Sequence, residues 1–117
     1  MNIPGPAKNA RIYIKPGHTD MRKSVNSLSA VVENEFRLNP FIDGLFAFCN
    51  RKKDIVKLLY WERNGFCIWY KRLEKDRFPW PQSEDSAREL TPEQLRWLLD
   101  GIDFRRAHRD LKYSRVT

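Results

Sequence analysis

The middle of this 117-residue sequence is rich in basic side chains, which are the strongest candidates for a chemical role. Residues 50–77 hold nine lysines and arginines against four carboxylates. Lysine and arginine neutralise phosphates and release their counterions, and exposed aromatic rings stack on bases. The pattern predicts nucleic-acid binding through Arg51, Lys52, Lys53, Lys57, Lys71, Arg72, Lys75 and Arg77.

A structural interpretation competes with this one. The aromatic residues Trp61 and Trp69 lie among the cations and favour places in the core, in which case the charges are an ordinary solvated rim. The tip of a turn contributes little to a core. A binding role is therefore favoured for the run Arg51, Lys52 and Lys53.

A second pair of cations, Arg22 and Lys23, follows Asp20 at the expected start of a helix. Cations in a first helical turn oppose the helix dipole. A bound phosphate at that helix end would account for them, because free N–H groups point outward there. An exposed pair offset by Asp20 needs no ligand, and the sequence leaves both explanations open.

Catalytic and metal-binding patterns are weak. The two histidines, His18 and His108, are far apart in sequence, and the glycines form no phosphate-binding loop. Cys49 and Cys67 lack a CxxC neighbour, which favours free thiols over a zinc or redox site. Carboxylates such as Asp20 suit helix starts and turns. We therefore expect no enzymatic activity, no metal and no cofactor.

Composition limits the chain to a single domain. A net charge of +7 favours polyanionic partners, and 41% hydrophobic residues suffice for one core. No apolar stretch approaches the roughly 18 to 20 residues of a membrane helix, so a cytoplasmic protein without membrane contact is expected. We expect a loose leader at 1–10, one domain at 11–104 and a basic tail at 105–117.

The first elements expected are a strand at 11–15 and a long helix at 20–37. The strand alternates around Tyr13 and ends at Pro16-Gly17. Thr19 or Asp20 could cap the helix, and Asn39-Pro40 would stop it. Its apolar stripe follows helical spacing and consists of Met21, Val25, Leu28, Val32 and Phe36.

Three apolar runs at 45–49, 55–61 and 66–71 predict an antiparallel meander. Asn64-Gly65 is a strong hairpin signal and would place Arg63 opposite Phe66. The central run is apolar on both faces, so the sheet needs cover on both sides. The helix at 20–37 can supply one cover.

The segment Phe78-Pro79-Trp80-Pro81 should run extended along the surface, because its prolines remove two N–H donors. Its rings could dock on a partner, which makes Phe78 and Trp80 candidate partner-binding residues. Thr91 and Gln94 then form a capping box for a helix at 92–100, and Gly101 is placed to end it. The whole pattern predicts an α+β fold, with a small antiparallel sheet (meander 45–71 plus strand 11–15) packed on the long helix.

Several of these motifs, in this order, resemble the accessory proteins of the IS-sixty-six group of insertion sequences, often called TnpB or Orf-two-like. They are unlike the RNA-guided nucleases that share the name TnpB. Ser24 and Asn26 stand where the family usually has Gly and Asp. The matching segments are 19–23 (TDMRK), 58–61 (LLYW), 64–66 (NGF), 69–74 (WYKRLE), 78, 80–81 and 98–103 (LLDGID).

The resemblance implies a non-catalytic protein required beside a separate transposase. Combined with the charge pattern, it predicts an accessory protein that binds element DNA or the transposase–DNA complex. The alternative is a protein adaptor that holds the transposase through the second sheet face and the 78–81 segment, without touching DNA.

Overall fold

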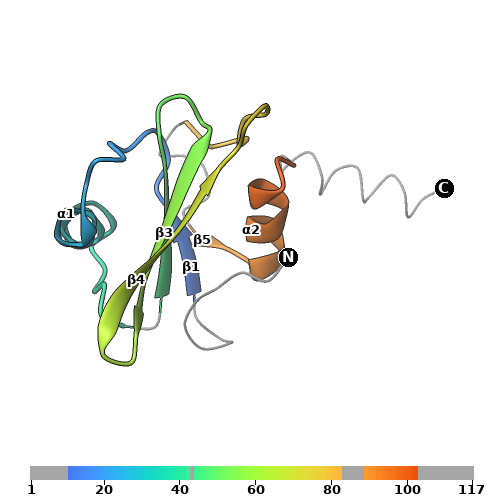
Figure 1. Cartoon of the computed structure of the whole chain (residues 1–117). Coiled ribbons are helices and arrows are strands. Elements are labelled where there is room, and N and C mark those ends of the chain that lie inside the picture. The colour runs from blue at the N-terminus through green and yellow to red at the C-terminus, as the bar shows by residue number, and fades with distance from the viewer. Residues whose placement is uncertain (1–10, 43, 83–88, 103–117) are drawn as a thin grey trace.

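The computed structural model describes residues 11–42, 44–82 and 89–102, and these form an α+β fold (Figure 1). A sheet stands between α1 on one side and α2 on the other. The expected leader at 1–10 and basic tail at 105–117 lie outside the described residues. The elements are β1 (Arg11–Ile14), α1 (Val25–Val31), the π-helical segment η1 (Val32–Phe36), β2 (Gly44–Cys49), β3 (Ile55–Glu62), β4 (Gly65–Arg72), β5 (Glu89–Leu90) and α2 (Pro92–Leu99).

The sheet has the order β4-β3-β2-β1-β5 and is mixed, so the expectation of a purely antiparallel sheet was wrong. The meander of β2, β3 and β4 is antiparallel as predicted. The strand β1 instead runs parallel to β2, with Ile12 opposite Leu45. Parallel neighbours need a crossover, which the α1–η1 helix provides. The short β5, which the sequence pattern did not indicate, pairs antiparallel with the other edge of β1.

The first helix is shorter than the predicted span of 20–37. It has seven α-helical and five π-helical residues, from Val25 to Phe36. Ser24 takes the N-cap position in place of Thr19 or Asp20. Arg37 adopts a left-handed φ of 57° and ends the helix before Asn39-Pro40. Arg22 and Lys23 therefore precede the helix, and the argument from its dipole does not apply to them.

The β3–β4 turn is displaced from the predicted position. Arg63 and Asn64 form the turn between Glu62 and Gly65, and Trp61 faces Phe66. Arg63 has a positive φ of 53°, the conformation that had been expected at Asn64-Gly65. Each β3 residue therefore pairs with the β4 residue two positions before the predicted one. Because side chains alternate between the faces of a strand with a period of two, each side chain stays on its predicted face.

Both faces of the central strand are covered, as its two apolar faces predicted. On one face, Leu59 packs with Phe46 of β2 and Leu28 of α1. On the other face, Leu58 packs with Leu95 and Leu98 of α2. The capping box of Thr91 and Gln94 is present, and Gly101 follows α2 with a φ of 84°. No helix in the described part of the chain is long and apolar enough to cross a membrane.

Phe78 and Trp80 complete the α2 side of the core. Their side chains are 1% and 3% exposed, so the expectation that they lie on the surface as partner-binding residues was wrong. The Phe78 amide donates to the carbonyl oxygen of Lys53 at 2.7 Å. The segment is extended, as its prolines require, but its rings point inward because the sheet face beneath them is apolar.

Candidate nucleic-acid interface

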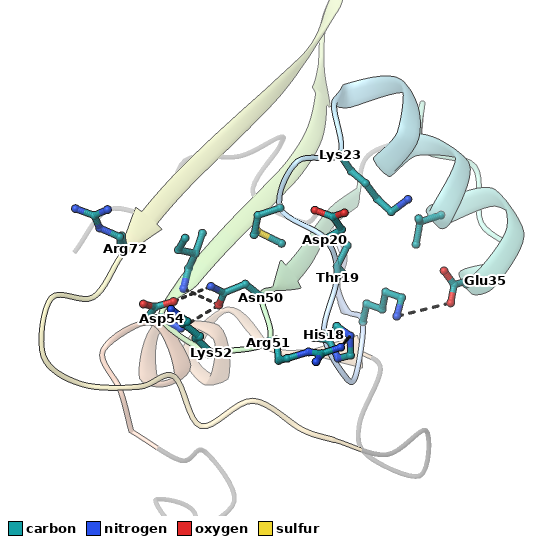
Figure 2. A pocket seen from close by; sticks show the side chains of 14 residues that line it. His18, Thr19, Asp20, Lys23, Glu35, Asn50, Arg51, Lys52, Asp54 and Arg72 are labelled. Carbon is teal, nitrogen blue, oxygen red and sulfur yellow. Dashed lines mark hydrogen bonds and ion pairs between the residues drawn. The ribbon is translucent and has the colours of Figure 1, made fainter.

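A cleft of about 690 Å³ opens at the end of the sheet where β1, β2 and β4 finish and β3 begins (Figure 2). The α1–η1 helix contributes Val31 and Glu35 to its walls, and three other segments form the rest: the connection from β1 to α1, the loop from β2 to β3, and the end of β4. Basic groups come from each of these three segments, namely Lys15, His18, Lys23, Arg51, Lys52 and Arg72. The carboxylates on the lining are Asp20, Glu35 and Asp54.

Asn50 organises the loop that carries Arg51 and Lys52. Its side-chain oxygen accepts from the amides of Asp54 and Ile55, both at 3.0 Å. Its side-chain nitrogen donates to the Asp54 carboxylate at 2.7 Å. This hydrogen bond is the first cause of the lowered pKa of Asp54. The loop is therefore held by its own side chains, and the two cations are exposed at its tip.

The connection after β1 is fixed to the sheet by backbone hydrogen bonds. The Lys15 amide donates to the carbonyl oxygen of Ala47 at 3.0 Å, and the Thr19 amide donates to the carbonyl oxygen of Cys49 at 2.7 Å. Gly17, with a φ of 76°, makes the bend that most residues with a Cβ avoid. The side chain of Trp80 donates from Nε1 to the Lys15 carbonyl at 2.8 Å.

Four of the cations predicted from the sequence line the cleft: Lys23, Arg51, Lys52 and Arg72. Sequence reasoning missed two neighbours, Lys15 and His18. His18 Nε2 lies 3.4 Å from an Arg51 guanidinium nitrogen, although the residues are 33 apart in sequence. No local signal joins them, because the parallel pairing of β1 with β2 brings the segments together.

Two predicted cations have structural partners instead. Lys57 Nζ donates to the carbonyl oxygen of Met21 at 2.6 Å. Lys71 Nζ donates to the Leu99 carbonyl at 2.9 Å, where a cation complements the end of α2. Their ammonium groups hold segments together, which leaves them less suited to bind phosphate.

The remaining predicted cations lie outside the cleft lining or are paired. Arg22 forms an ion pair with Asp20 at 2.8 Å, although 92% of its side chain is exposed. Its hydrogen bonds lower the pKa of Asp20. Lys53 has a positive φ of 63° in the loop, and Lys75 and Arg77 are exposed beyond β4.

The acidic residues of the lining reduce its positive charge locally. Glu35 lies 3.7 Å from Lys15, and Asp20 is held by Arg22 outside the lining. Thr19 is also on the lining; it is 5% exposed, and its hydroxyl has no hydrogen-bond partner. Within the described residues, no three His, Cys, Asp or Glu side chains are grouped as metal ligands.

The fold and cleft define a small α+β protein with a basic hollow at one end of a mixed sheet. The chain belongs to the family described as IS66 Orf2 like protein, which matches residues 10–109. This confirms the resemblance seen in the motifs, and the family points to a role in the transposition of an insertion sequence.

Two relatives from Sinorhizobium fredii are similar over nearly their whole length. One, described as "Uncharacterized protein y4hO", is 38% identical over 93% of this chain and 95% of its own. The other, "Uncharacterized protein y4jC", is 30% identical over 90% of each chain. No solved structure matches this chain significantly.

Proposed function

We propose that this protein assists transposition by binding the DNA of its insertion sequence, alone or in complex with the transposase, through the basic cleft. The observation that carries the proposal is the convergence of five lysine and arginine side chains, with His18 beside them, from three separate segments around one hollow. Convergent cations raise the local potential for phosphate more than the same charges spread over a surface. Membership of the IS66 Orf2-like family indicates that this binding serves transposition.

Lys15 and His18 lie beside the lining cations that the sequence suggested, and Lys15 is paired with Glu35. The loop cations Arg51 and Lys52 are exposed and lie on a loop that Asn50 holds in shape. The backbone of this loop is therefore ordered before a phosphate binds, which lowers the entropy cost of binding. Because Glu35 is paired with Lys15, it opposes the other lining cations less, and Lys23, Arg51, Lys52 and Arg72 can bind phosphates.

Salt-dependent binding of a labelled duplex by the full chain tests the proposal. If about five phosphates are neutralised, log affinity falls with log salt at a slope of roughly −4 to −5. Arg51→Glu should weaken binding and reduce the slope by about one. Arg96→Glu is the matched control, because Arg96 is exposed on α2 and does not line the cleft. No binding at low salt, or equal losses in the two variants, would exclude the cleft as the DNA site.

A protein-adaptor function is the second candidate, and a different surface favours it. The sheet face that the adaptor hypothesis relied on is covered by α2 and by Phe78 and Trp80. Phe41 and Ile42 are 53% and 52% exposed, however, and the ring centroids of Phe41 and Trp61 lie 5.2 Å apart. Co-purification with the transposase that survives nuclease treatment, and is lost in Phe41→Ser, would support the adaptor.

A further inference from the structure

The size and shape of the cleft limit which part of a nucleic acid can enter it. Its volume of about 690 Å³ lies within the range of pockets that enclose small molecules. A duplex is a convex rod and can contact the exposed cations at the rim of the cleft, such as Arg51 and Lys52. A single nucleotide of a strand can enter such a hollow.

The chemistry of the lining also suits a whole nucleotide better than a phosphate alone. Met21, Val31 and Ile55 give the cleft apolar wall beside the cations. Phosphate gains nothing from apolar wall, whereas the faces of a sugar and a base do. Figure 2 shows Lys23 and Arg51 on opposite sides of Thr19, and the apolar residues belong to the same lining.

Carboxylates on the lining repel a phosphate, but they can accept hydrogen bonds from a base. The Asp54 carboxylate accepts from Asn50 through Oδ1, and its second oxygen can accept a further hydrogen bond. Ionised carboxylates accept hydrogen bonds from the amino groups of bases. A lining with cations, apolar wall and acceptors together matches the three parts of a nucleotide.

We infer that the cleft binds an unpaired nucleotide of a DNA strand, its phosphate among the lining cations and its base against Met21 and Ile55. The inference rests on the proposed function, since it names the part of the DNA that the cleft holds. Unpaired nucleotides occur at strand ends and where a duplex is opened, and such positions are the ones that this protein should prefer.

The test compares three DNA probes with the full chain at one salt concentration. They are a blunt duplex about two helical turns long, the same duplex with a short unpaired 3′ extension, and the same duplex with a 5′ extension. One of the extended probes should bind about tenfold more tightly than the blunt one, the size expected when a base buries apolar surface against Met21 and Ile55. Deoxycytidine 5′-monophosphate, whose base carries an amino group, should compete for this extra affinity, and inorganic phosphate at equal concentration should compete much less.

Two substitutions of one type locate the effect. Ile55→Ser removes apolar wall from the cleft and keeps every charge, so it should abolish the preference for the extended probe over the blunt duplex. Ile42→Ser is the matched control on an exposed residue outside the lining, and it should keep the preference. Circular dichroism melting checks that both variants are folded.

The outcomes separate this inference from the proposed function. Equal affinity for blunt and extended probes, with a steep salt dependence, overturns the unpaired-nucleotide inference and leaves DNA binding intact. Absence of binding to every probe overturns both. Equally strong competition by inorganic phosphate also overturns the inference, because the site would then recognise the phosphate alone.

Discussion

The ammonium group of Lys57 lies 2.6 Å from the carbonyl oxygen of Met21 and ties the connection between β1 and α1 to the middle strand of the meander. Replacing Lys57 with Met keeps most of the apolar stem and removes the charged donor. We expect Lys57→Met to lower the free energy of unfolding by about 1.5–3 kcal/mol, the usual range for a hydrogen bond to a charged group. Urea unfolding measures this.

Lys75→Met serves as the control for that substitution, because Lys75 is exposed beyond β4. Its effect should stay within about 0.5 kcal/mol. If Lys57→Met unfolds at the same urea concentration as the wild type and binds duplex more weakly, Lys57 is a DNA contact after all.

Trp80 should behave as a core residue that also holds the lip of the cleft. Trp80→Phe keeps an aromatic ring in the core but removes the donor to the Lys15 carbonyl. We expect a loss of about 1–3 kcal/mol in the free energy of unfolding. Trp97→Phe, at a half-buried position on α2, should cost less. Weaker transposase binding by Trp80→Phe, with unchanged stability, would restore the partner-binding hypothesis for this residue.

Thr19 carries a buried hydroxyl without a partner, which is an unfavourable arrangement in the free protein. Valine has nearly the same shape and no hydroxyl, and the Thr19 amide can still donate to Cys49. Thr19→Val should therefore leave the free energy of unfolding unchanged or raise it by about 1 kcal/mol. Thermal melting tests this. A lower melting temperature would mean that the hydroxyl is hydrogen-bonded in solution.

Acidification should loosen the loop that carries Arg51 and Lys52. The Asn50 side chain lowers the pKa of Asp54 in the folded state. The carboxylate therefore contributes stability that is present above its unfolded pKa, near 3.9, and is lost as the pH falls through its lower folded value.

The variant Asp54→Asn lacks this titration. The stability difference between the wild type and Asp54→Asn should therefore shrink as the pH falls from about 5 to below the folded pKa. Urea unfolding at a series of pH values measures the difference. A constant difference over this window would show that the Asp54 pKa is the same in both states.

We also expect no strand cleavage or joining by this chain with Mg²⁺ or Mn²⁺. Phosphoryl transfer by two metal ions needs clustered carboxylates, and Asp20 and Asp54 are engaged by Arg22 and Asn50. Incubation of supercoiled plasmid with purified protein tests the expectation. Nicking that disappears in Asp54→Asn or Asp20→Asn would show that the chain has an active site.

The sequence determined most elements of this fold, because they depend on local pattern; the exceptions are β5 and the start of the first helix, which begins at Val25 and not at residue 20. Alternation placed the three strands of the meander to within a residue or two, and the Thr91 capping box located the start of α2. The two apolar faces of the central strand required cover on both sides. The ordered motifs also identified the family, since they depend only on residue identity and order.

Tertiary structure decided how those elements meet. The direction of β1 relative to β2 depends on a crossover, and nothing local distinguishes a parallel partner from an antiparallel one. That pairing puts His18 beside Arg51 and creates the cleft. The inward turn of Phe78 and Trp80 likewise depends on an apolar sheet face formed by distant strands.

The same reason explains the divided roles of the cations. The sequence predicted a nucleic-acid contact at Lys57 and Lys71 as well as at Arg51 and Lys52, although it favoured the turn tip. A lysine stem is long enough to reach a carbonyl on another element, and only the packing determines whether one is within range. Met21 and Leu99 offer such carbonyls to Lys57 and Lys71, whereas the tip of the β2–β3 loop leaves Arg51 and Lys52 facing solvent and the cleft.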